Sequence, residues 1–107
     1  MKPIVFVGDT LKRVREFPED VRRTIGHELR DVQFGEDPSD WKPMPSIGPG
    51  VREIRVREAS GAFRVIYVAH FEAAIYVLHA FRKKTQKTSP ADIDLARSRL
   101  RAIGEER

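Results

Sequence analysis

Alternating apolar and polar residues in the middle of the chain predict three consecutive β-strands. In the first run, VREIRVR at 51–57, apolar positions alternate with charged ones, so an extended strand has one apolar and one charged face. The second run, FRVIYVA at 63–69, carries Arg64 among apolar neighbours. The third run, AIYVLHAF at 74–81, is apolar on both faces, as in a central strand that is covered on both sides. Because the connecting turns are short, the strands are expected to form an antiparallel meander.

Apolar residues at helical spacing predict helices before and after these strands. Before them, apolar positions recur every three or four residues from 21 to 32, behind a short helix that starts near Thr10. After them, a second apolar stripe runs from 93 to 103. It follows Ser89 and Pro90, which are favourable at a helix N-cap and in a first helical turn. The chain is therefore expected to have a helical hairpin ahead of the meander and a C-terminal helix behind it.

The order of these elements predicts an α+β fold in a single domain, residues 1–107. An apolar run at 2–7 is expected to add an N-terminal strand to the meander, which gives a small antiparallel sheet. The helical hairpin is expected to cover one face of that sheet. The segment 35–50 is rich in proline and glycine, so it is expected to be irregular surface chain with Trp41 as its anchor.

Basic residues are concentrated in the predicted meander. The chain has a formal net charge of +4 and a pI near 9.8. Between residues 51 and 88 there are eight basic and three acidic residues, a net of 8 − 3 = +5. The eight basic residues are Arg52, Arg55, Arg57, Arg64, Arg82, Lys83, Lys84 and Lys87. Such a surface indicates an acidic partner, with nucleic acid the first candidate and an acidic protein the second.

Several classes of function are not supported by the sequence. The chain has no cysteine, which excludes disulfides and thiolate metal sites. It has no nucleotide-binding P-loop, no HExxH and no GxSxG motif, so neither a cofactor nor a metal is expected. No apolar run approaches the roughly 20 residues of a membrane span, and the N-terminus is not typical of a signal peptide. A cytoplasmic protein without membrane contact is therefore expected.

Three motifs in the second half of the chain carry a resemblance to a known family. A segment of glycine, aromatic residue, arginine, hydrophobic residues and tyrosine ends at Tyr67, the segment 78–90 reads LHAFRKKTQKTSP, and the C-terminal helix contains IDLARSR at 93–99. Together they resemble the HigB-like, phage-derived branch of the RelE/ParE toxin superfamily. The resemblance implies a RelE-like fold and the toxin half of a type II toxin–antitoxin pair, which cuts mRNA on the ribosome and inhibits translation. The implied partners are a cognate antitoxin, the ribosome and mRNA.

The resemblance also implies which basic residues act on RNA. Carried over by position, the strand arginine of the active site falls on Arg64. The other catalytic candidates are Arg55, Arg57, Lys83 and Lys84, and the RNA-binding candidates are Arg82, Lys87 and Arg52. Many members of the family carry a tyrosine or histidine at the site late in the chain, whereas no such residue follows His79 here.

Metal-independent RNA cleavage uses the 2′-OH of the substrate as nucleophile. It needs fixed positive charge at the phosphorane, a base for the 2′ proton and an acid for the leaving oxygen. Arginine suits the first task, because its guanidinium can bind two phosphate oxygens and stays charged. A lysine whose pKa is lowered by neighbouring cations, such as Lys83 or Lys84, suits proton transfer. Glu53 is a candidate base, although pairing with a neighbouring arginine is the more usual role of such a carboxylate.

Other interpretations of the same residues stay open. In a structural interpretation, Arg64 pairs with Glu53 or another acid across the sheet, and the cations at 82–87 belong to a solvated loop. His79 is expected to be packed on the strand face that also holds Val77. For the whole chain, the alternatives are a non-catalytic poison of DNA gyrase, as in the ParE branch, and a module that only binds nucleic acid.

Overall fold

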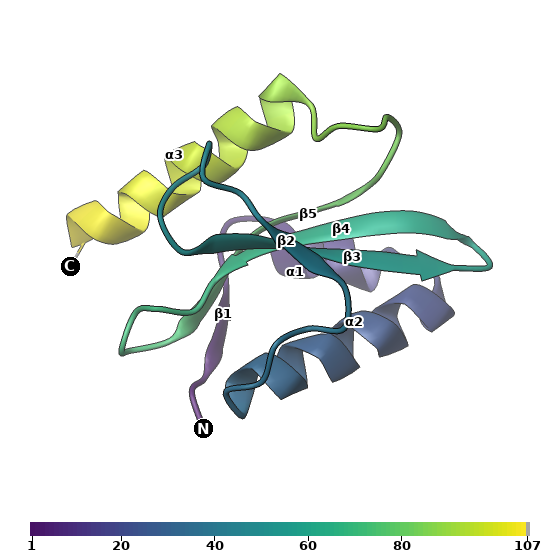
Figure 1. Cartoon of the computed structure of the whole chain (residues 1–107), viewed down its shortest axis with the longest axis horizontal. Helices are drawn as coiled ribbons and strands as arrows, with labels where there is room; N and C mark the ends of the chain where they lie inside the picture. Colours follow the sequence, from purple (N-terminus) through teal and green to yellow (C-terminus); the bar gives the residue numbers. More distant parts are fainter. Residues whose placement is uncertain (107) are drawn as a thin grey trace.

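A five-stranded mixed sheet forms the centre of the computed structural model, which describes residues 1–106 (Figure 1). The three predicted strands are present as β3 (Val51–Glu58), β4 (Gly61–Val68) and β5 (Ile75–Arg82), and each pairs antiparallel with its neighbour in sequence. Two short edge strands, β1 (Ile4–Phe6) and β2 (Trp41–Pro43), complete the strand order β1-β5-β4-β3-β2. The predicted α+β fold with an N-terminal strand and a central meander is therefore confirmed.

Two features of the sheet differ from the prediction. First, β1 runs parallel to β5, so the sheet is mixed rather than antiparallel. The strands are far apart in sequence, so no tight turn fixes their relative direction. Second, the segment predicted as irregular contains β2, in which Trp41 pairs with Ile54. Its last residue, Pro43, is tolerated because a proline on an edge strand need not donate to the sheet.

Helices cover both faces of this sheet. The predicted helical hairpin consists of α1 (Thr10–Arg15) and α2 (Glu19–Gln33), and the predicted C-terminal helix is α3 (Pro90–Glu106). Figure 1 shows α2 on one side of the sheet and α3 on the other. We call these sides the α2 face and the α3 face. In the described part of the chain, no helix is both long and apolar enough to span a membrane.

Strand β4 contributes to two separate hydrophobic cores because its side chains alternate between the faces. Val65 and Tyr67 join the core under α1 and α2, whereas Ile66 and Val68 join the core under α3. All four side chains are at most 1% exposed. Arg64 follows the same alternation and therefore lies on the α3 face.

A β-bulge in β5 changes the face of the residues that follow it. Ile66 is paired with His79, but the next residue of β4, Tyr67, is paired with Val77, so Leu78 is an extra residue in β5. The prediction that His79 shares a face with Val77 is therefore wrong. His79 lies on the α3 face, where its ring stacks on Phe81 with centroids 4.9 Å apart.

Candidate nucleic-acid interface

Four cations meet on the α3 face, at the end of the sheet where β3 and β4 join. Arg55 and Arg64 are direct cross-strand partners, and Arg57 follows two residues along β3 on the same side. With Lys83, these side chains line a hollow of about 450 Å³, which we call the arginine hollow. Its described lining is completed by Asp40 and Gln86, so four cations face one carboxylate.

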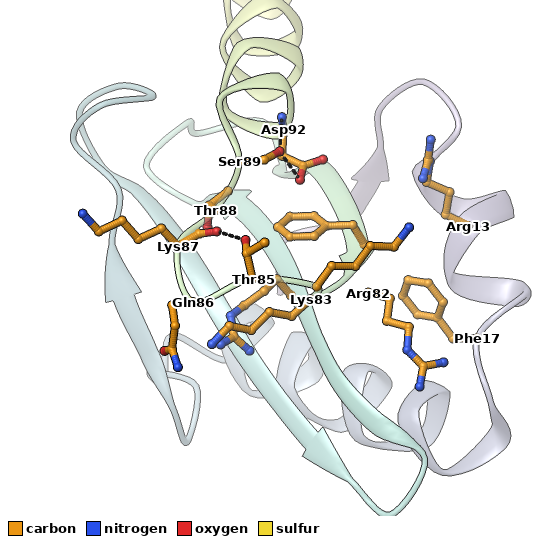
Figure 2. A pocket seen from close by; sticks show the side chains of 13 residues that line it. Arg13, Phe17, Arg82, Lys83, Thr85, Gln86, Lys87, Thr88, Ser89 and Asp92 are labelled. Carbon is orange, nitrogen blue, oxygen red and sulfur yellow. Dashed lines mark hydrogen bonds between the residues drawn. The ribbon is translucent and has the colours of Figure 1, made fainter.

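A second hollow of about 490 Å³ lies under the loop that joins β5 to α3. We call the segment 83–89 the β5–α3 loop and this cavity the loop hollow. Figure 2 shows the loop side chains on one side and Arg13 and Phe17 on the other. Phe81 contributes a second aromatic ring to the lining. The two hollows share Arg64 and Lys83, so they form one continuous site.

Arg64 is a buried cation with a buried counter-ion. Its residue is only 5% exposed, its Nε lies 3.5 Å from Oε1 of Glu53, and its Nη1 donates to the carbonyl of Phe63 at 3.0 Å. Burial lowers the pKa of Arg64, while the Glu53 carboxylate acts in the opposite direction. An arginine stays protonated in proteins, so the side chain supplies a permanent positive charge to the site.

Glu53 is enclosed in the protein next to Arg64 and is only 1% exposed. Its Oε1 faces Arg64, and its Oε2 accepts a hydrogen bond from Oγ1 of Thr88 in the β5–α3 loop. Both oxygens are therefore engaged within the protein. Of the two roles considered from the sequence, the structure shows the pairing with arginine.

Arg55 anchors the chain beside the arginine hollow and carries one unsatisfied buried donor. Its backbone N–H donates to the carbonyl of Asp40 at 2.8 Å, which fixes the chain just before β2 beside the hollow. Among the described residues, the side-chain Nε of Arg55 is buried without a hydrogen-bond partner. A buried N–H of a cation is costly to leave unpaired, so this donor is a local energetic cost of the fold beside the hollow.

Lys83 stands between the two hollows. Its backbone N–H donates to the carbonyl of Ala62 at 2.8 Å and so extends the pairing of β5 with β4 by one step. Partial burial lowers the pKa of Lys83, and the charges of Arg64, Arg57 and Arg55 lower it further. Lys83 is therefore the lysine of the predicted set whose environment favours proton transfer.

The remaining cations of the β5–α3 region surround the loop hollow. Arg82 points to the α2 face, where its guanidinium lies 5.4 Å from the ring centroid of Phe63 and donates to the carbonyl of Ser60 at 2.9 Å. It still contributes to the rim of the loop hollow, as do the exposed side chains of Lys84 and Lys87. The structure therefore brings these three residues to the edge of the site rather than to its centre.

Arg52 is the one predicted residue that the described structure does not bring to either hollow. It pairs with Tyr67 across the strands and lies on the α2 face, opposite to Arg55. Its guanidinium is 2.7 Å from Asp37 and 3.9 Å from the ring centroid of Trp41. This contact also gives Trp41 the anchoring role that the sequence indicated.

Several lining residues were not among the predicted site residues, and four of them show why. Asp40 belongs to a segment without periodic pattern, and Thr88 gave no signal apart from its place before the helix cap. Phe17 lies between two predicted helices and was given no role. Phe81 pairs with Arg64 across β4 and β5. The bulge in β5 shifts the pairing of the strands by one residue, so regular alternation along the sequence does not reveal this contact.

A histidine and an aspartate fix α3 next to the loop hollow. His79 Nε2 lies 2.7 Å from Oδ1 of Asp92, and Oδ2 of Asp92 accepts from Oγ of Ser89 at 2.8 Å. Burial lowers the pKa of His79, whereas Asp92 opposes that shift. Within residues 1–106, no cluster of three or more His, Cys, Asp or Glu side chains could hold a metal ion.

Comparison with protein families gives one match, which covers most of the chain. The model of the family described as "Phage derived protein Gp49-like (DUF891)" matches residues 12–101. No curated protein matches the chain at a significant level.

Solved structures share the fold of the chain. A mutant of E. coli toxin RelE in the free state has a TM-score of 0.66 at 16% identity, covering 95% of this chain and 97% of that one. The isolated E. coli RelE toxin has a TM-score of 0.65 at 18% identity, with both chains fully covered. A chain of the intact E. coli RelBE toxin–antitoxin complex has a TM-score of 0.64 at 19% identity, covering 79% of this chain and 100% of that one.

Proposed function

The chain belongs to the phage-derived Gp49-like family, and from this premise we propose that it is the toxin of a type II toxin–antitoxin pair. The match over residues 12–101 confirms the phage-derived family that the motifs indicated. The similarity to E. coli RelE confirms the expected RelE-like fold. Because one similar chain comes from a toxin–antitoxin complex, a cognate antitoxin is the proposed partner of this chain as well.

The proposed activity is ribosome-dependent cleavage of mRNA, and the observation that carries it is the arginine hollow. Arg55, Arg57, Arg64 and Lys83 converge there. In the described lining these cations face only one carboxylate, that of Asp40, so the hollow is strongly electropositive. Guanidinium groups gathered in a concave site favour a phosphate, and they favour the more highly charged phosphorane of a cleavage reaction even more.

In the proposed reaction, the 2′-oxygen of one nucleotide attacks the adjacent phosphorus. The P–O2′ bond forms, the P–O5′ bond breaks, and the products are a cyclic phosphate and a 5′-OH. Arg64 and Arg55 stabilise the charge on the phosphorane, and the loss of one such donor costs about 3 to 4 kcal/mol. A base takes the 2′ proton, and Lys83, with its lowered pKa, supplies a proton to the leaving 5′-oxygen.

The loop hollow is proposed to bind the nucleotides on either side of the cleaved bond. Its aromatic rings, Phe81 and Phe17, offer apolar surface for a base next to the scissile phosphate. Lys84, Lys87 and Arg82 stand at the rim, where they can contact neighbouring phosphates. The antitoxin is proposed to neutralise the protein by covering this same surface with an acidic or apolar segment.

Induction of the wild type and of Arg64→Ala in cells without the antitoxin gene tests this function. We expect the wild type to stop growth and to produce new mRNA 5′ ends in frame with translation. The variant should lose roughly 10² to 10³ in cleavage rate, because a donor to the phosphorane is removed. Mapping of mRNA 5′ ends over the first minutes after induction measures the effect.

The matched control is Arg23→Ala, which removes an exposed arginine of α2 whose side chain is 73% exposed. This control should cut mRNA like the wild type. Growth arrest by the wild type with intact mRNA and damaged DNA would instead support a gyrase poison. Nucleic-acid binding without any growth arrest would instead support a module that only binds nucleic acid.

A further inference from the structure

Glu53 connects two parts of the site that are far apart in the sequence. One carboxylate oxygen faces Nε of Arg64 in β4, and the other accepts a hydrogen bond from Thr88 at the end of the β5–α3 loop. Glu53 and Thr88 are separated by 35 residues. The carboxylate therefore ties the arginine at the centre of the site to the loop that carries Lys83, Lys84 and Lys87.

Because Glu53 and Arg64 are buried, the positions of their charged groups are restricted. Glu53 and Arg64 are 1% and 5% exposed, so neither charge can be satisfied by water alone. Loss of the Thr88 hydroxyl would leave a buried carboxylate oxygen without its donor. The carboxylate would then be drawn toward other donors, and the guanidinium paired with it would move as well.

The same link leaves one edge of the guanidinium available. Nε of Arg64 faces Glu53, and Nη1 donates to the carbonyl of Phe63. Among the described residues, Nη2 makes no hydrogen bond, and Arg64 lines both hollows. The Glu53 pair therefore fixes the orientation in which the free amino group can meet an anion.

We propose that Glu53 and Thr88 are positioning residues, which hold the guanidinium of Arg64 and the β5–α3 loop in one fixed arrangement for the substrate phosphate. This inference rests on the proposed function for its effect on catalysis, but the arrangement itself exists without RNA. The loop is held at both ends, by the backbone bond from Lys83 to Ala62 and by the side-chain bond from Thr88 to Glu53. Removal of the second tether loosens the end of the loop and the Glu53–Arg64 pair together.

The chain offers a matched control for this link. Oγ1 of Thr24 in α2 donates to Oε2 of Glu58 in β3 at 2.6 Å. This hydrogen bond also joins a threonine to a glutamate of β3, and it is partly buried. Thr24 lines neither hollow. Thr24→Val and Thr88→Val therefore make the same chemical change on opposite faces of one strand.

Cleavage in a reconstituted translation system tests the catalytic consequence. Thr88→Val is expected to lower kcat by about ten-fold or more with little change in KM, since a misplacement of about 1 Å can cost up to about 10² in rate. Thr88→Ser keeps the hydroxyl and should recover most of the loss. Equal kcat values for Thr88→Val and Thr24→Val would overturn the positioning role.

The NMR signal of the Arg64 Nε–H group tests the arrangement without any cleavage. The signal is assigned by its disappearance in Arg64→Lys. It should shift or broaden in Thr88→Val and in Glu53→Gln, and it should stay in place in Thr24→Val. An unchanged signal in Thr88→Val would refute the link, whereas an altered signal with a wild type that cuts no mRNA would refute only the proposed function.

Discussion

At the scale of the residue, Arg64 is an ionised side chain that is almost fully buried. A charge in such a place persists only with a compensating partner, which is Glu53 at 3.5 Å. Arg55 and Lys83 nevertheless add positive charge on the open side of the pair. The charge of Arg64 is therefore compensated by Glu53 on the protein side of the site. The solvent side stays electropositive, and a bound anion relieves the repulsion between its cations.

Lys83 provides a pH test at this scale. Partial burial and the cations Arg64, Arg57 and Arg55 lower its pKa. Arg57→Ala removes one of these cations, so the pKa of Lys83 should rise toward its ordinary value. If the protonated amine donates to the leaving oxygen, the rate falls as pH rises through this pKa, and the alkaline limb should move to higher pH in the variant.

The pH dependence of cleavage, measured for the wild type and Arg57→Ala, checks this prediction. The exposed arginine variant Arg23→Ala should keep the wild-type profile. An alkaline limb at the same pH in all three proteins would exclude Lys83 as the proton donor.

At the scale of the element, the bulge in β5 determines how α3 is attached to the sheet. The extra residue Leu78 has its carbonyl bonded by Nη1 of Arg99 at 2.9 Å, and Nη2 of the same arginine lies 2.7 Å from Asp9. Hydrogen bonds from Arg99 and Arg13 lower the pKa of Asp9 to about 2. One arginine of α3 thus joins the helix to the bulge and to the start of α1.

Substitution of this arginine should destabilise the fold. In Arg99→Met the apolar stem is preserved, but the Leu78 carbonyl loses its side-chain donor. An unsatisfied buried acceptor costs about 1 to 3 kcal/mol, so we expect a loss of this size in the free energy of unfolding. Urea denaturation measures it. Arg23→Met, on the exposed surface of α2, should stay within about 0.5 kcal/mol of the wild type, and an equal loss in both would contradict the role of Arg99.

The fold should also lose stability in acid. Burial lowers the pKa of His79 below 6.5, with Asp92 opposing the shift and Arg13 and Arg99 adding to it. The unfolded chain therefore binds a proton at a higher pH than the folded one. The stability that neutral His79 contributes is complete above pH 6.5 and is lost as the pH falls from there toward the lower pKa of the folded state.

Urea denaturation on both sides of pH 6.5 tests this effect. The free energy of unfolding should decrease on acidification in the wild type, and it should decrease less in His79→Gln, which cannot gain this proton. Parallel pH curves for the two proteins would show that His79 does not titrate differently in the folded state.

At the scale of the whole molecule, the two faces of the sheet are used differently. The α2 face is covered by α1 and α2 over a continuous core. The α3 face is covered by α3 over a second core, and the arginine hollow lies on that face. The loop hollow extends from it to Arg13 and Phe17 on the other side of β5. The chain therefore presents a cationic surface at one end of the sheet.

This charge distribution predicts a steep salt dependence for RNA binding. Each cation that contacts a phosphate releases counterions, so Lys87→Ala should lower the slope of log affinity against log salt by about one. Titration of a single-stranded RNA oligonucleotide at several salt concentrations measures the slope. Arg23→Ala should keep the wild-type slope, and an equal reduction in both variants would mean that RNA does not follow the loop.

The hydrophobic pattern alone determined the three central strands, the helical hairpin and the C-terminal helix, because each is a local periodicity of the chain. It also placed Arg55 and Arg57 on one face of their strand, whereas the observed pairing of Arg55 with Arg64 added Arg64 to that side. The parallel pairing of β1, the short strand β2 and the bulge at Leu78 depended on contacts between distant segments.

The tertiary structure alone decided which cations share a site. Strand alternation already separates Arg52 from Arg55, but only the fold brings Asp37 and Trp41 against Arg52. The link from Thr88 through Glu53 to Arg64 likewise depends on a loop that folds back over a strand. Such contacts leave no periodic trace in the sequence, because their energy comes from burial and charge pairing between residues that are far apart along the chain.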